Sequence, residues 1–156
     1  HKDLGGSGGS WSNPGGANGN IWINNKEKNG VAGADDDGNG FIDDWVGWDF
    51  VTAPVTTCWA GEDCVGADND PRDFNGHGTH CSGIVSALNN NGTGVSSPAG
   101  GWGTGVNTTT GNGVKVMCLR IGHSASYGGQ EVGFVRMDSA ASAFYYAANN
   151  GAKVAS

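Results

Sequence analysis

The sequence predicts an α/β fold in which helices cover a sheet of parallel strands. A nearly continuous apolar run, "VKVMCLRI" (residues 114–121), suits a strand that is buried on both faces, as strands of parallel sheets are. The segment 130–150 is rich in small residues at helical spacing and predicts a helix that ends at Gly151, after which "AKVAS" begins another strand. A strand, a helix and a strand in this order form a βαβ unit, which requires a parallel sheet.

The earlier part of the chain alternates loops with short ordered elements. Residues 1–33 are rich in Gly, Asn and Ser and predict surface loop, with one short strand or turn at "NIWIN". The aromatic and β-branched residues of "WVGWDFV" (45–51) predict a strand. Apolar residues recur at helical spacing after His77, and the asparagines and glycine of 89–92 end that helix. A long loop is expected from 93 to 113.

Length and charge narrow the classes of protein to consider. The chain has 156 residues, which fits one domain with a modest core. Fifteen acidic residues against eight basic ones give a net charge of −7, which argues against a nucleic-acid surface. No apolar run approaches the roughly 18 to 20 residues that span a bilayer, so we expect no membrane partner. We expect a monomer.

The four cysteines divide into two pairs with different expected roles. Cys58 and Cys64 flank a short polar loop, where a local disulfide is plausible in an oxidising compartment, and this favours secretion. Cys81 and Cys118 each sit inside an apolar segment, and we interpret both as buried free thiols.

The stretch "DFNGHGTHCSG" places two histidines three residues apart among glycines, at the start of the predicted helix. A histidine in the first turn of a helix is anchored by the core while its ring stays near the surface, and Gly76 and Gly78 let other backbone approach closely. This suits a general base, which must come within about 3 Å of the proton it takes. Two alternatives stay open on spacing alone: a structural histidine, or metal ligation by His77 and His80, with Cys81 as a possible further ligand.

The longer string "NGHGTHCSGIVSA" closely resembles the histidine motif of the subtilisin-like serine proteases, the subtilases. "HKDL", "NIWIN", "DDDGNGFIDDWVGWDFV", "VKVMCLRI" and "YAANNGAKVAS" are similar to successive segments of that family, in the same order. The resemblance implies a three-layer fold with a parallel sheet between helices. It also implies a secreted serine endopeptidase that acts on proteins and peptides, with His77 as the base of an Asp-His-Ser triad and His80 as a structural neighbour.

The chain departs from the family pattern at the other two triad positions. The family places the aspartate on a strand that would precede His1, and it places the serine in a Gly-Thr-Ser-Met-like string that does not occur here. We therefore expect residues 1–156 to be an internal part of a subtilase catalytic domain that is inactive by itself. The alternative is a catalytically inactive subtilase-like domain with a calcium-dependent binding or scaffolding role.

The acidic stretch "DDDGNGFIDD" is a candidate calcium loop. Oxygen ligands at alternate positions around a glycine turn can wrap a hard cation at about 2.3 to 2.6 Å, although Val46 stands where an EF-hand has its glutamate. The alternative is a solvated acidic turn. Related subtilases hold a structural Ca²⁺ in similar loops. The expected ligands are Asp35, Asp37, Asn39, the carbonyl of Phe41, Asp43 and Asp44.

Overall fold

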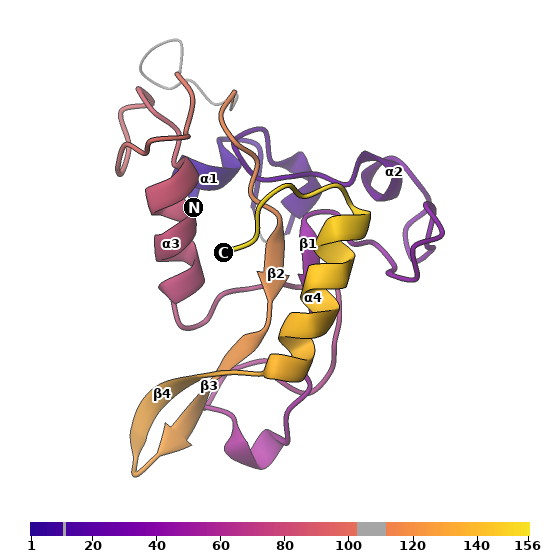
Figure 1. The fold of residues 1–156 in the computed structure, drawn as a ribbon, viewed down its shortest axis with the longest axis vertical. Helices are drawn as coiled ribbons and strands as arrows, with labels where there is room; N and C mark the ends of the chain where they lie inside the picture. The colour runs from indigo at the N-terminus through magenta and orange to yellow at the C-terminus, as the bar shows by residue number, and fades with distance from the viewer. Residues whose placement is uncertain (11, 103–111) are drawn as a thin grey trace.

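The computed structural model describes residues 1–10, 12–102 and 112–156, so residues 103–111 of the expected long loop lie outside the described part. Figure 1 shows the helices and strands, coloured in their order along the chain. They are α1 (Lys2–Gly5), η1 (Pro14–Gly16), α2 (Asn25–Lys28), β1 (Gly47–Asp49), η2 (Val55–Thr57), α3 (His77–Ser86), β2 (Cys118–Arg120), β3 (Gly122–Tyr127), β4 (Gln130–Val135) and α4 (Met137–Asn149). Within these ranges, no helix is both long and apolar enough to cross a membrane.

A small parallel sheet forms the centre of the fold and confirms the α/β class. β1 and β2 pair in parallel, with Gly47 opposite Cys118. Ile21, in the predicted short strand or turn, adds a parallel bridge to Val116 just before β2. Gly47 has a φ of 133°, and a Cβ there would lie 1.8 Å from the carbonyl oxygen of Cys118. Glycine is therefore needed at this contact between the two strands.

Helix α4 lies alongside β1 (Figure 1) and is fixed to it by polar and aromatic contacts. The hydroxyl of Ser139 donates a 2.8 Å hydrogen bond to the carbonyl of Phe50, directly after β1. The buried ring of Tyr146 meets Phe41 edge-on, with ring centroids 4.9 Å apart, and Phe50 at 5.8 Å. Edge-to-face pairs of this kind each add about 0.5 to 1.5 kcal/mol beyond the area that they bury.

The segment before α4 is a strand, which corrects the expected helix over 130–150. β3 and β4 form an antiparallel hairpin whose last pair is Tyr127 with Gln130. Gly128 and Gly129, the two loop residues between them, have φ values of 58° and 79°. Two consecutive positive φ angles define the tight turn that matches the twist of a hairpin, and glycine adopts them without strain. The turn therefore delays the helix until Met137.

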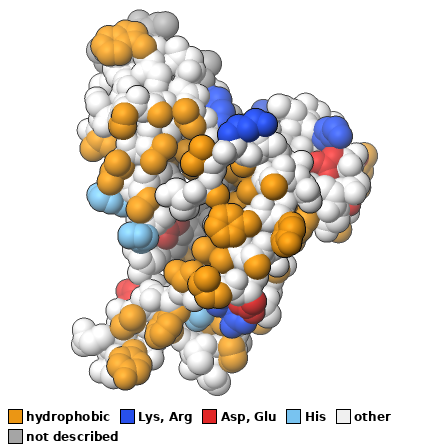
Figure 2. All heavy atoms as spheres, in the orientation of Figure 1, with side chains coloured by type: hydrophobic (Ala, Val, Ile, Leu, Met, Phe, Trp, Pro, Cys, Tyr) orange, Lys and Arg blue, Asp and Glu red, His pale blue; other side chains and the backbone are white. Residues whose placement is uncertain are grey.

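Two further expectations about burial and strands are wrong. The residues of "AKVAS" form no strand, and Val154 is 85% exposed. The run 114–121 is not buried on both faces, since Val114 is exposed and residues 116–119 are half-buried. Figure 2 shows hydrophobic side chains at the surface over α4, where Phe144 and Tyr145 are largely exposed. Apolar residues that the sequence pattern assigns to a core therefore lie at the surface of the described chain.

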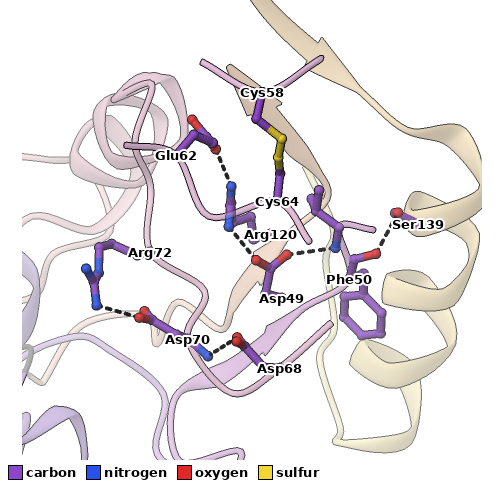
Figure 3. A network of polar contacts seen from close by, with 11 residues as sticks. Asp49, Phe50, Cys58, Glu62, Cys64, Asp68, Asp70, Arg72, Arg120 and Ser139 are labelled. Carbon is purple, nitrogen blue, oxygen red and sulfur yellow. Dashed lines mark hydrogen bonds and ion pairs between the residues drawn. A yellow bond between two sulfur atoms is a disulfide. The ribbon is translucent and has the colours of Figure 1, made fainter. Parts of the chain in front are cut away.

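A buried ionic network lies at the C-terminal ends of β1 and β2 (Figure 3). The guanidinium of Arg120, at the end of β2, forms ion pairs with Asp49 and with Glu62. Glu62 lies in the loop closed by the Cys58–Cys64 disulfide, which confirms the expected pairing. The side chains of the three charged residues are at most 6% exposed. The disulfide loop thus carries a carboxylate into the interior beside the sheet.

Candidate functional site

Helix α3 begins at His77, as the sequence predicts, and its first turn is capped from outside the helix. Gly76 precedes it with a left-handed φ of 88° and has no side chain to offer. Asp73 accepts hydrogen bonds from the backbone N–H of Gly76 at 2.8 Å and of Thr79 at 2.7 Å. Burial acts to raise the pKa of Asp73, but these hydrogen bonds outweigh it and the pKa is lowered. Asp73 is therefore an ionised cap of α3.

The two histidines both lie on the exposed side of α3. Figure 2 shows histidine side chains at the surface over this helix. The Nε2 atom of His77 lies 3.7 Å from the Sγ atom of Cys81, one turn further along. The backbone N–H of His80 makes the helical hydrogen bond to Gly76. Because Asp73 accepts hydrogen bonds from the backbone N–H groups at the start of the helix, the ring of His77 is not used as a cap and is exposed to solvent.

The free cysteines differ from the expected buried pair. Cys81 is exposed, whereas Cys118 is half-buried in β2, where burial raises the pKa of its thiol to about 11. The sequence interpretation is therefore wrong for Cys81. It lies at an apolar-looking position of α3, but this face of the helix is uncovered, as the exposure of Ile84 and Val85 also shows.

Part of the predicted calcium loop is occupied by hydrogen bonds that build its turns. Asp35 accepts from the backbone N–H of Gly38, Asn39 and Gly40 at 2.7 to 3.0 Å. Asn39 in turn accepts from the N–H of Phe41 at 2.8 Å. The ring of Phe41 packs in the aromatic cluster with Tyr146. The side chains of Asp35 and Asn39 therefore shape the loop through its backbone.

The carboxylates that the structure does bring together include one that the sequence analysis missed. Glu27, Asp37 and Asp44 each offer an oxygen, and these atoms lie within 4.8 Å of one another. Glu27 is 1% exposed and accepts from the N–H of Asp37 at 2.9 Å and of Asp43 at 3.0 Å. The two carboxylate oxygens of Asp43 differ: Oδ2 accepts from the N–H of Gly33 at 2.7 Å, whereas Oδ1 is buried and has no hydrogen-bond partner among the described residues.

Asp44 is the most deeply buried member of this group. Its oxygens accept from the side-chain amides of Asn24 at 2.7 Å and Asn39 at 2.9 Å, and from the hydroxyl of Tyr146 at 2.5 Å. Burial raises the pKa of Asp44, the three hydrogen bonds oppose the rise, and the nearby charge of Asp37 adds to it. Three carboxylates in this space favour a neighbouring positive charge.

The α/β fold thus carries an exposed histidine, His77, at the first turn of α3. The model of the subtilase family matches residues 53–156, and the chain belongs to this family. The match begins just after β1 and includes the disulfide loop, α3 and α4.

Several curated proteins are similar to the chain over part of their length. Subtilisin-like protease 1 of Plasmodium vivax is 45% identical over 76 residues, and that of Plasmodium berghei is 43% identical over 77 residues. These matches cover 49% of the chain and about 10% of each relative. Thermitase of Thermoactinomyces vulgaris is 51% identical over 39 residues, which are 25% of the chain and 14% of that protein. No solved structure matches the chain.

Proposed function

We propose that the chain is part of the catalytic domain of a secreted, monomeric serine endopeptidase that hydrolyses peptide bonds in proteins. The complete domain would have three layers, with the parallel sheet between helices. The observation that carries this proposal is the exposed ring of His77 at the capped start of α3, within a segment that the family model matches. The Cys58–Cys64 disulfide supports an oxidising compartment outside the cytosol.

In the proposed mechanism, His77 transfers one proton twice. Its Nε2 atom takes the proton of a serine hydroxyl as the oxygen attacks the peptide carbonyl, and then gives that proton to the leaving amine. An aspartate that accepts from Nδ1 would hold the ring in the required tautomer. Asp73, the carboxylate nearest to His77 in sequence, already accepts from Gly76 and Thr79 and is not assigned this role. The proposal takes the serine and the aspartate from parts of the protein outside residues 1–156.

The test uses the full-length protein and two histidine variants of the same helix. We expect His77→Ala to lower kcat by about 10⁴-fold or more on a peptide substrate, the order known for triad members of serine proteases. His80→Ala is the matched control and should keep most of the activity, since His80 is exposed on the same helix but is not assigned a role in proton transfer. Equal activity of wild type and His77→Ala would refute the proposal. A full-length protein that turns over no peptide but binds calcium would favour the inactive, calcium-dependent binding domain.

We further propose that one structural Ca²⁺ binds at the carboxylates of Glu27, Asp37 and Asp44. Two oxygens on opposite sides of a calcium ion are about 4.6 to 5.2 Å apart, because each lies about 2.3 to 2.6 Å from the ion. The separation of up to 4.8 Å among the three ligand atoms fits this span. Asp43, which has a buried oxygen with no hydrogen-bond partner in the described part of the chain, is a further predicted ligand that stays in the proposal. Asp35, Asn39 and the Phe41 carbonyl also stay in it.

Thermal unfolding in calcium and in chelator tests the proposed ion. At a calcium concentration about 100-fold above Kd, binding adds about 2.7 kcal/mol, or roughly 5 to 10 °C for a unit of this size. We expect Glu27→Gln to abolish most of this shift. Asp36→Asn is the matched control, because Asp36 belongs to the same loop but its carboxylate accepts from Val31 outside the group. A calcium shift that Glu27→Gln leaves unchanged would refute the assignment of Glu27.

A further inference from the structure

His123 is a buried titratable side chain that neither the proposed proton transfer nor the proposed calcium group uses. It lies on β3 and is 8% exposed. Its ring stacks on the ring of Phe134 in β4, with centroids 6.2 Å apart and an angle of 27° between the planes. Its Nδ1 atom is buried and has no hydrogen-bond partner among the described residues. This setting suits a neutral imidazole, because an imidazolium would bury a charge and two N–H donors.

Three charged groups of the described chain act on the ring of His123. Burial is the largest cause and lowers the pKa of His123; the carboxylate of Glu62 opposes it, and the guanidinium groups of Arg120 and Arg136 add to it. Glu62, in the disulfide loop, is already ion-paired with Arg120 at the end of β2. Its attraction for a proton on His123 therefore does not make up for the hydration that the buried ring has lost.

The β3–β4 hairpin meets the disulfide loop through the strand that carries His123. The backbone N–H of Trp59 donates a 2.8 Å hydrogen bond to the carbonyl of Ser124, and Cys58 forms an antiparallel bridge with Ala125. All six residues of β4 are exposed. Figure 1 shows the hairpin extending away from the parallel sheet, at the lower left. The attachment of the hairpin to the disulfide loop thus directly follows His123 in β3.

We propose that protonation of His123 releases the β3–β4 hairpin from the disulfide loop, so that the hairpin is closed at neutral pH and opens in acid. In the open state the ring is hydrated and takes a proton from solvent. Because the closed state holds this proton less well, its stability is fully present above about pH 6.5, the ordinary pKa of histidine, and is lost as pH falls below it. Asp49, whose raised pKa gives stability that increases in acid, has the opposite dependence, so the sign of the effect identifies the histidine.

The consequence for the base rests on the proposed function. A Cβ at Gly133 in β4 would lie 3.3 Å from the Nδ2 atom of Asn75, two residues before His77. β4 therefore borders the segment that leads into α3. Release of the hairpin would move β4 away from this segment and change the surroundings of His77.

Hydrogen exchange of the full-length protein, resolved to single amides between pH 7 and pH 5 with calcium present, tests the inference. The reporters are the amides of Trp59 and of Arg136, which donates to Ile121 at 2.9 Å. After correction for the intrinsic pH dependence of exchange, we expect the opening constant to rise severalfold toward pH 5. The upper limit is about 25-fold, for one histidine that titrates at about pH 6.5 when open and stays neutral when closed. The amide of Trp22, which donates to Val116, should show no such rise.

Two histidine variants separate this effect from other titrations. His123→Phe keeps an aromatic ring for the stack on Phe134 and cannot take a proton, so its opening constant should not rise in acid. His80→Phe is the matched control, because His80 is exposed on α3, and it should keep the wild-type dependence. A titration of the His123 ring in the wild type, followed by NMR, needs no variant and should have its midpoint below pH 6.5.

Three results would overturn the inference. They are an opening constant that is unchanged or falls in acid, a rise in acid that persists in His123→Phe, and a midpoint of His123 at or above pH 6.5. Because these measurements use no peptide turnover, a protein that opens in acid but cleaves no peptide would contradict the proposed function and support the release of the hairpin.

Discussion

Replacing Arg120 with methionine tests whether the buried ionic network holds the disulfide loop on the sheet. The change keeps much of the aliphatic volume and removes the cation that neutralises Asp49 and Glu62. Asp49 is completely buried, and burial raises its pKa to about 6 even though Val51 and Arg120 oppose the rise. Without Arg120, two carboxylates would face each other in the interior with no positive charge beside them.

The expected loss follows from the burial of all three charges. Removing one partner of a buried ion pair costs about 3 to 5 kcal/mol, because the other charge is left uncompensated. A domain of ordinary stability has about 5 to 15 kcal/mol in total. The matched control is Arg72→Met. Arg72 also lies over the ring of Phe74, but its ion pair with Asp70 is 42% and 34% exposed, so we expect a loss of about 0 to 1 kcal/mol.

The dependence on pH separates the charge effect from lost packing. A raised carboxyl pKa means that the folded state binds more protons than the unfolded state between about pH 4 and the folded pKa, so stability falls as pH rises through this window. In Arg120→Met the pKa of Asp49 rises further, and the deficit should be largest at pH 7 and shrink toward pH 4. Urea unfolding, followed by tryptophan fluorescence, measures the free energy of unfolding of the variant and the wild type at each pH. A loss no larger than that of Arg72→Met, or one that is independent of pH, would refute the reasoning.

Three further changes test other contacts. Replacing Cys58 and Cys64 with serine opens a loop with a sequence separation of 6 and should lower the free energy of unfolding in urea by about 2 kcal/mol. A reductant should lower the free energy of unfolding of the wild type by the same amount. Gly47→Ala should lower the free energy of unfolding by at least about 2 kcal/mol, because its Cβ would overlap the Cys118 carbonyl. Gly83→Ala in α3 meets no atom within 4 Å and should raise the free energy of unfolding by about 0.5 to 1 kcal/mol. Equal effects would contradict the close approach of β1 and β2. Asp73→Ala should lower the free energy of unfolding by about 1 kcal/mol at pH 7, because it removes the cap of α3. Since the pKa of Asp73 is lowered, this contribution should be lost as pH falls below about 4. A difference between variant and wild type that survives at pH 2 would exclude the charged cap.

The sequence predicts those elements whose signals are local. The helix at His77 follows from apolar residues at helical spacing and from the asparagines and glycine that end the pattern, and the disulfide follows from two cysteines around a short polar loop. The segment 130–150 shows the limit of spacing arguments, because Val132 and Val135 fit a helical period but belong to β4. The Gly128–Gly129 pair was the available signal, since consecutive glycines between strand-forming residues favour a hairpin turn.

The acidic group depends on contacts that no local pattern encodes. Glu27 stands between two lysines, a setting typical of a solvated helix, yet it is 1% exposed because the acidic loop folds over it. The backbone N–H groups of Asp37 and Asp43, 10 and 16 residues later, point at its two oxygens. Sequence reasoning identified Asp37 and Asp44 because both belong to the acidic stretch around the glycine turn, and it could not bring Glu27 to them without the fold.

The hydrogen bonds of Asp73 explain why the ring of His77 does not cap helix α3. The first turn of a helix exposes backbone N–H groups that nearby side chains usually satisfy, and a histidine there could be consumed as a cap. In this chain Asp73 satisfies Gly76 and Thr79 from outside the helix. The left-handed Gly76 turns the chain so that the carboxylate reaches back over the helix start. His77 therefore occupies the first helical position with its ring exposed to solvent, and its Nε2 atom lies 3.7 Å from the Sγ atom of Cys81.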